Sequence, residues 1–169
     1  MVTGGSLGAQ SINDCLRNSL LELTKTFHVV HLCGKGNIDH SYDHLEGYRQ
    51  YEFVGKHMAD LYAMADVVVS RAGSNTITEL VALKKPHLLI PLPAAQSRGD
   101  QLLNADAFEA LGYSMVLQQE HLTPKTLVKS IHYLYQHPNV FVDKMAKYAF
   151  ADGTRHILNV IESLVTHKI

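Results

Sequence analysis

The first segment that could do chemistry is the glycine-rich stretch "TGGSLGAQSIND" near the start of the chain. Gly4 and Gly5 allow positive φ and a close approach of the backbone to a ligand, and Ser6 adds a hydroxyl group. A helix predicted to begin near Leu7 would present unpaired N–H groups and a partial positive charge to an anion. The segment is typical of a phosphate-binding loop, although a plain tight turn into a helix explains the same residues equally well.

A second segment, "SRAGSNTITEL", combines an apolar helix side with a carboxylate. On a helix beginning near Ser74, Ile77, Leu80 and Val81 lie on one side and Glu79 on the opposite side. A carboxylate one turn inside a helix could accept hydrogen bonds from both hydroxyls of a ribose, while the helix N-terminus faces the phosphates. The alternative is a solvated glutamate on an exposed helix face.

A third segment, "PAAQSRGDQLLNA", places amide and carboxylate groups at the start of another predicted helix. Asp100, Gln101 and Asn104 provide donors and acceptors suited to sugar hydroxyls. N-capping of the helix by Asp100, followed by a polar first turn, is the alternative interpretation.

Two familiar phosphate motifs and a metal site are disfavoured. The glycines do not follow G-x-G-x-x-G, and Gly34-Lys35 is followed by Gly36 rather than by Ser or Thr, as a Walker loop requires. His40 and His44 stand at i, i+4 spacing, but the chain has no H-E-x-x-H and no D-x-D motif. We therefore expect surface histidines, no metal site and no cofactor.

Composition narrows the class of protein. The chain has 169 residues, 46% of them hydrophobic, and a formal charge of -1, so we expect a single domain over residues 1–169 with an ample core. The sequence has no basic stripe of the kind that binds nucleic acid, and none of its apolar runs approaches the ~20 residues that span a bilayer. Cys15 and Cys33 are predicted to be isolated buried thiols in a reducing, cytoplasmic compartment.

The elements that must position these segments follow an alternating pattern. Short apolar runs at 27–32, 51–54, 66–70, 87–92 and 113–118 predict buried strands, and segments of helical periodicity lie between them. This alternation predicts a doubly wound, Rossmann-like parallel sheet of the α/β class. After residue 122 we expect a helical tail, with Thr123 as an N-cap and an amphipathic helix over 152–165. Ligands of such folds bind at the carboxyl ends of the strands, where the three segments lie.

Four motifs in order resemble the C-terminal half of the UDP-N-acetylglucosamine transferases of peptidoglycan synthesis, the MurG family. They are "GGSLGAQSIN", "YEFVGKHMADLYAMADVVVSRAGSNTITEL", "ALKKPHLLIPLP" and "GDQLLNADAFEALG". The resemblance extends from Val2 to about Leu164. It implies the GT-B architecture, in which two Rossmann-like domains face each other across a cleft and the C-terminal domain binds the nucleotide sugar.

The resemblance also implies roles for individual residues. Gly5 and Ser6 would lie at the diphosphate and sugar, Val54 would pair with uracil through its backbone, and Glu79 would bind the ribose. The resemblance further implies that Ser74, Asn75 and Thr76 line the nucleotide, and that Gln101, supported by Asn104, contacts the acetylglucosamine. Some members have Gln where this chain has Asp100, which leaves that contact open.

For the full-length protein, the resemblance implies an inverting transferase that converts lipid I to lipid II. Such a protein would be peripheral on the inner face of the bacterial cytoplasmic membrane. We expect this chain to be its donor-binding half, able to bind UDP-N-acetylglucosamine without turnover, because the catalytic base and the lipid I site belong to the N-terminal half. The alternatives are a donor-binding subunit that works with a separate acceptor chain and a UDP-N-acetylglucosamine epimerase-like fragment.

Overall fold

The computed structural model describes residues 1–5, 7–147 and 161. Ser6 and, apart from residue 161, the helix expected over 152–165 lie outside the described residues. Six parallel strands form one sheet in the order β3-β2-β1-β4-β5-β6, which confirms the doubly wound α/β fold. The strands are β1 (Val2–Thr3), β2 (Val29–Leu32), β3 (Tyr48–Tyr51), β4 (Val68–Ser70), β5 (His87–Leu89) and β6 (Met115–Val116).

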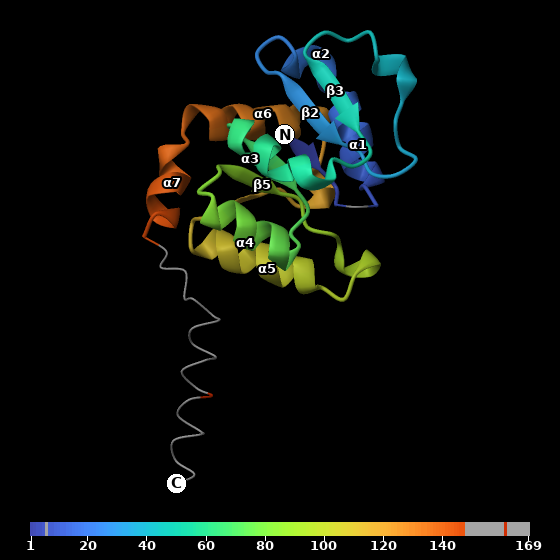
Figure 1. Ribbon diagram of the computed structural model, residues 1–169. Helices are drawn as coiled ribbons and strands as arrows, with labels where there is room; N and C mark the ends of the chain where they lie inside the picture. Colours follow the sequence, from blue (N-terminus) through green and yellow to red (C-terminus); the bar gives the residue numbers. More distant parts are fainter. Residues whose placement is uncertain (6, 148–160, 162–169) are drawn as a thin grey trace.

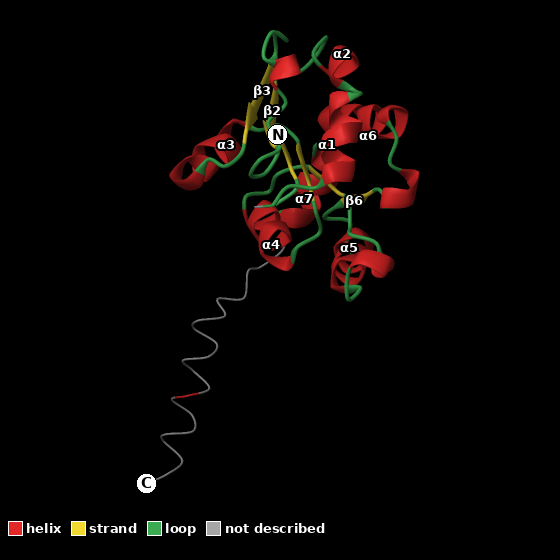
Figure 2. Cartoon of the chain, turned by 90° about the vertical axis from the view of Figure 1, so that its right-hand side faces the viewer, coloured by secondary structure: helices red, strands yellow, loops and turns green. Residues whose placement is uncertain are grey.

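Helices cover both faces of this sheet. Figure 2 shows α3 and α4 on one side of the sheet and α1 and α6 on the other, and α1 packs against α6. Figure 1 shows α5 beside α4. The helices are α1 (Gln10–Arg17), α2 (Leu20–Leu23), α3 (Met58–Met64), α4 (Ser74–Ala82), α5 (Asp100–Ala110), α6 (Pro124–Gln136) and α7 (Asn139–Met145).

The phase of α4 agrees with the sequence pattern. Ile77, Leu80 and Val81 are buried, and Glu79 is exposed on the opposite side. Leu80 packs with Tyr62 of α3 and Val68 of β4, so the apolar side of α4 faces the sheet. The polar side of the helix is therefore free to meet a ligand.

Several sequence-based boundaries are wrong: the strands predicted at 87–92 and 113–118 are only His87–Leu89 and Met115–Val116, and two further elements are displaced. The strand predicted at 51–54 is β3, which begins at Tyr48 and ends at Tyr51, and Phe53 is 72% exposed. Because β3 is an edge strand that pairs only with β2, it does not need the continuous apolar run on which that prediction depended. The first helix begins at Gln10 rather than near Leu7, because a turn closed by the Gly8 N–H and the Gly5 carbonyl comes first.

Two buried histidines are held neutral by their burial. His31 on β2 lies 2.8 Å from the Tyr48 hydroxyl and 2.9 Å from Asn13 Oδ1. His87 on β5 lies 2.7 Å from the Lys85 carbonyl and 2.6 Å from Ser114 Oγ. Burial lowers the pKa of each imidazole from 6.5 to about 4, with Arg17 adding to the effect at His31.

The free energy of unfolding should therefore fall as the pH decreases from about 6.5 towards 4, because the unfolded chain takes up protons on both histidines before the folded chain does. Each buried histidine contributes at most ~1.4 kcal/mol per pH unit in this interval. Urea unfolding of His87→Gln between pH 7 and pH 4.5 should give a shallower dependence than wild type. The exposed control His44→Gln should keep the wild-type slope, and an unchanged slope in His87→Gln would contradict this account.

Candidate functional site

The candidate site lies at the carboxyl ends of the central strands. The chain runs from β1 to β2 and β3 on one side of the sheet and from β4 to β5 and β6 on the other, so the strand order reverses between β1 and β4. A cleft of about 620 Å³ opens at this reversal, where ligands of doubly wound folds bind. Its lining comes from the segments after β1, β4, β5 and β6 and from the first turns of α1 and α5: Gly4, Gly5, Leu7, Gly8, Ala9, Gln10, Ser11, Arg71, Leu92, Gln96, Gln101 and Gln119.

The helices that begin beside this cleft have uncapped N-termini. The N-caps of α1, α4 and α5 are Ala9, Gly73 and Gly99, and none makes a side-chain capping bond. Helix α6, in contrast, begins at a full capping box in which the Thr123 hydroxyl accepts from the Thr126 N–H. The first N–H groups of α1, α4 and α5 are therefore available to an external acceptor such as a phosphate.

The glycine-rich loop is held by a close contact between two backbones. A Cβ on Gly8 would overlap the Cys33 carbonyl oxygen, and a Cβ on Gly34 would overlap the Gly8 backbone. Asn13 of α1 donates to the same Cys33 carbonyl at 2.9 Å, so the helix and the loop are tied to the end of β2. Gly5 also has positive φ, 86°, but open space lies where its Cβ would be.

Arg71, the residue after β4, connects four segments around the cleft. One terminal nitrogen donates to the carbonyls of Ile90 at 3.1 Å and Pro91 at 3.3 Å. The other donates to Ser11 Oγ at 3.1 Å and to Gln119 Oε1 at 2.7 Å. Burial lowers the pKa of the guanidinium, but an arginine remains charged in proteins. The cleft thus contains a cation whose partners are all neutral.

Gln101 and Asn104 of α5 both bond to loops at the cleft end of the sheet. Gln101 Oε1 accepts from the Leu92 N–H at 3.1 Å, which leaves its amide NH₂ as the end free to bind a ligand. The Asn104 amide donates to the Ala72 carbonyl at 3.1 Å and joins α5 to the loop before α4. Asp100 is exposed at the first position of α5, and the N-cap is Gly99, so the alternative interpretation, N-capping by Asp100, is wrong.

Glu79 has a partner that sequence reasoning missed. The Tyr62 hydroxyl of α3 donates to Glu79 Oε2 at 3.3 Å, which orients the carboxylate on the exposed side of α4. Burial and the nearby Glu79 carboxylate raise the pKa of Tyr62 to about 12, so the phenol keeps its proton and remains a donor. One carboxylate oxygen and the second lone pair of the other are left for a ligand.

Only part of the predicted set lines the cleft. Gly5 and Gln101 do so, whereas the other described members, Val54, Ser74, Asn75, Thr76, Glu79, Asp100 and Asn104, lie outside its lining. Val54 is the N-cap of a 3₁₀ turn, Gly55–His57, and its carbonyl accepts from the His57 N–H at 3.1 Å. Sequence reasoning did not select Arg71, Ser11 or Gln119, although the place of Arg71 directly after a strand was a signal.

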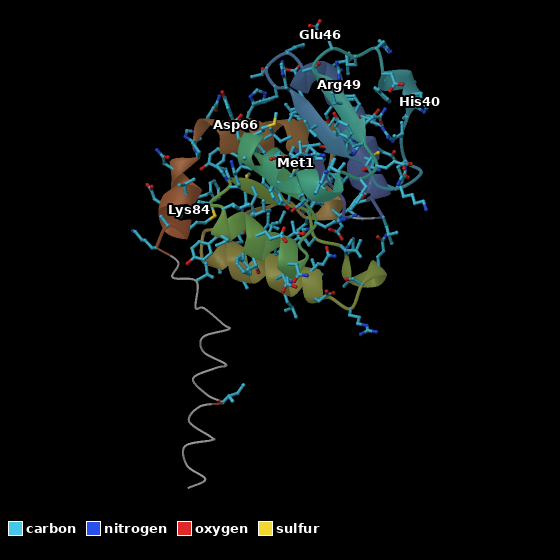
Figure 3. The ribbon with its side chains drawn as sticks, in the orientation of Figure 1. Met1, His40, Glu46, Arg49, Asp66 and Lys84 are labelled. Atoms are coloured by element: carbon cyan, nitrogen blue, oxygen red, sulfur yellow. The ribbon has the colours of Figure 1, made fainter. Side chains whose placement is uncertain are left out.

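No group of three or more His, Cys, Asp or Glu residues suited to a metal ion occurs within the described part of the chain. His40 lies at the outer edge of the molecule (Figure 3), where its Nδ1 is 2.8 Å from an Asp43 carboxylate oxygen. Cys15 and Cys33 are buried free thiols, as expected, and burial raises the pKa of Cys15 to about 11. None of the described helices is both long and apolar enough to cross a membrane.

Comparison with known proteins places the chain in a family. The model of the glycosyltransferase family 28 C-terminal domain matches residues 1–159. The chain belongs to this family. The resemblance to glycosyltransferases that the four motifs indicated is thus confirmed, and the family 28 domain includes the whole cleft.

Relatives of this family 28 domain include longer transferases. The chain is 49% identical over 162 residues to a Clostridium perfringens protein and 46% identical over 162 residues to a Clostridium botulinum protein. Both are named UDP-N-acetylglucosamine--N-acetylmuramyl-(pentapeptide) pyrophosphoryl-undecaprenol N-acetylglucosamine transferase. The alignments cover 96% of this chain but only 45% and 46% of those relatives, so the chain spans about half their length.

Solved structures agree on the fold. Acinetobacter baumannii MurG matches with a TM-score of 0.79 and 26% identity, over 96% of this chain and 48% of that one. The calicheamicin glycosyltransferase CalG4 matches with a TM-score of 0.75 and 18% identity, over 99% of this chain and 43% of that one. The fold is therefore that of one half of a GT-B glycosyltransferase, as the sequence predicted.

The two glycines of the phosphate-type loop should respond differently to the same substitution. Gly8→Ala combines positive φ with overlap of the Cys33 carbonyl and should cost about 3 kcal/mol or more of unfolding free energy. Gly5→Ala meets no atom and should cost only about 1–2 kcal/mol, from positive φ alone. Urea unfolding of both variants checks this, and equal losses would show that the contact between the two loops is not tight.

Proposed function

We propose that this domain binds the donor of a hexosyl transfer, UDP-N-acetylglucosamine, at the carboxyl end of its sheet. The observation that carries the proposal is the cleft where the strand order reverses, which brings together the loop of Gly5, the uncapped start of α1, Arg71 and Gln101. Backbone N–H groups and a cation suit a diphosphate, and an amide beside them suits sugar hydroxyls.

The choice of sugar nucleotide and of reaction rests on the relatives. Proteins 46% and 49% identical to this chain carry the name of an N-acetylglucosamine transferase that acts on a pyrophosphoryl-undecaprenol acceptor. We therefore propose that the chain serves as the donor-binding half of an enzyme that converts lipid I to lipid II at the inner face of the cytoplasmic membrane. The lipid acceptor and the catalytic base would belong to the other half of such an enzyme.

Each predicted residue has a proposed place along the donor. The diphosphate would lie against Gly5 and the start of α1, with Ser6 contributing from outside the described residues. The ribose hydroxyls would donate to Glu79, and the first turn of α4, with Ser74, Asn75 and Thr76, would face the nucleotide. Uracil would pair with the Val54 backbone, and the sugar hydroxyls would bind Gln101 and its neighbours Asp100 and Asn104.

In the transfer step, the acceptor hydroxyl would attack the anomeric carbon and UDP would leave with inversion at that carbon. The developing negative charge on UDP would be stabilised by the uncapped N–H groups of α1 and α4, which are oriented before the reaction begins. We propose that this leaving-group stabilisation needs no metal ion, because no acidic pair of the D-x-D type is available to hold one.

The proposal predicts that the chain binds UDP-N-acetylglucosamine more tightly than UDP-glucose, with no detectable binding of NAD, in calorimetric titrations. Glu79→Gln should weaken UDP binding by about 1.5–3 kcal/mol, the value of a charged hydrogen bond. The melting temperature should hardly change, since Glu79 is exposed and the amide oxygen can still accept from Tyr62.

Tyr62→Phe is the matched control for this experiment. It removes only the hydroxyl that orients Glu79 and should weaken UDP binding less than Glu79→Gln does. Affinity for NAD equal to that for UDP-N-acetylglucosamine would overturn the donor assignment. Unchanged UDP affinity in Glu79→Gln would remove Glu79 from the site.

Gln101→Glu tests the sugar end of the donor. The variant keeps an oxygen to accept from the Leu92 N–H but loses the amide NH₂. Because UDP and UDP-N-acetylglucosamine share the same diphosphate, the added charge affects both, and the sugar contact is read from their affinity ratio. The binding free energy that the sugar adds to UDP should become weaker by about 0.5–1.5 kcal/mol, the value of one neutral hydrogen bond. An unchanged ratio would show that the amide NH₂ does not contact the sugar.

A further inference from the structure

Arg71 is a half-buried cation in the cleft that is bonded only to neutral groups. Its side chain is half-buried at the point where the strand order reverses, and its two terminal nitrogens make four hydrogen bonds. All four acceptors are neutral: two main-chain carbonyls, a serine hydroxyl and a glutamine amide. Among the ion pairs of residues 1–5, 7–147 and 161, none involves Arg71.

A half-buried cation without a carboxylate needs a physical reason. Removing a guanidinium from water is costly, and buried charges in proteins are usually paired with an opposite charge. The four hydrogen bonds of Arg71 satisfy its donors but leave its charge uncompensated. In a partly desolvated cleft that charge acts on a ligand more strongly than it would in open water.

Gln119 is the partner that keeps the charge uncompensated. A guanidinium can only donate, so the Gln119 atom 2.7 Å from Arg71 is the amide oxygen, and the same oxygen accepts from Ser11 Oγ at 2.9 Å. A glutamate in this position could accept both hydrogen bonds with the same geometry and would also neutralise the arginine. The chain instead has the uncharged isostere of glutamate, and both Arg71 and Gln119 line the cleft.

We propose that Arg71 is the charge that selects the diphosphate of the nucleotide, and that Gln119 sets this selectivity by holding Arg71 in place without neutralising it. The inference rests on the proposed function and deepens it. The terminal nitrogens of Arg71 remain bonded to the protein, so Arg71 acts on the anion across the cleft as a positioning residue, and the N–H groups of α1 and the glycine-rich loop make the direct contacts.

A purely structural role is the competing explanation. Arg71 joins α1, the end of β5 and the Gln119 turn, and a clamp of this kind would hold the cleft in shape for any ligand. The two explanations differ in one respect. Loss of a clamp weakens the binding of neutral and charged ligands alike. Loss of a charge weakens the binding of the charged ligand only, and this effect is smaller at high salt.

Gln119→Glu separates them, because it keeps both hydrogen bonds to the side-chain oxygen and puts a negative charge in place of the amide NH₂. UDP affinity, measured by calorimetry in low salt, should fall by about three- to tenfold. Uridine affinity, measured by chemical-shift titration, should stay within about twofold of wild type. The loss of UDP affinity should be smaller in high salt, and the melting temperature of the variant should not decrease. Gln118→Glu is the matched control, since it adds the same charge on a neighbouring residue that does not line the cleft, and its UDP affinity should stay within about twofold of wild type.

A second pair of variants keeps the test decisive if Gln119→Glu fails to fold. Arg71→Lys retains the charge and should preserve the UDP-to-uridine affinity ratio, whereas Arg71→Met should lower it. Equal losses for UDP and uridine, or no loss of UDP affinity in Gln119→Glu, would overturn the inference while leaving donor binding intact. Absence of UDP binding in the wild-type chain would overturn the proposed function itself, and this inference with it.

Discussion

The arrangement of the cleft depends on one steric constraint, the contact of the Gly8 backbone with the end of β2. Neither Gly8 nor Gly34 can carry a Cβ there, because each position is filled by the backbone of the other loop. The contact is reinforced by Asn13, which donates to the Cys33 carbonyl and is itself bonded to the buried His31. As a result, the glycine-rich loop ends against β2, α1 begins at Gln10, and the first two residues of α1 line the cleft.

The electrostatics of the cleft depend on helix starts that lack side-chain caps and on the Arg71 cation. Helices α1, α4 and α5 begin without side-chain caps, whereas α6 is fully capped by Thr123. Arg71 adds a full positive charge whose bonded partners are neutral. Uncapped helix starts and a cation without an opposite charge cost stability, and a diphosphate bound beside them would offset that cost. Helices α2, α3 and α7 also lack a side-chain cap, so the assignment of the cleft depends on the combination of uncapped helix starts with Arg71 at one end of the sheet.

Membership of glycosyltransferase family 28 gives this arrangement a chemical context. The chain spans about half of its relatives, and a GT-B enzyme divides its labour between two domains. The donor role proposed for this chain would use its N–H donors, the Arg71 cation and the amides on α5. Glu79 is oriented by Tyr62, although both lie outside the lining of the cleft. A nucleotide that extends from the cleft across the start of α4 would connect these two groups of residues.

The sequence by itself determined the layered architecture, because alternating strand and helix periodicities admit few folds other than a parallel sheet covered on both faces. It also determined the buried side of α4, the cap of α6 at Thr123 and the isolated thiols, all of which depend on local spacing. Only the tertiary structure decided where α1 begins, where β3 lies and which residues gather in the cleft. Arg71 and Gln119 are 48 residues apart in the chain, and Asn104 reaches back to Ala72. Such contacts depend on how strands are ordered in the sheet, and no local pattern of residue types encodes that order.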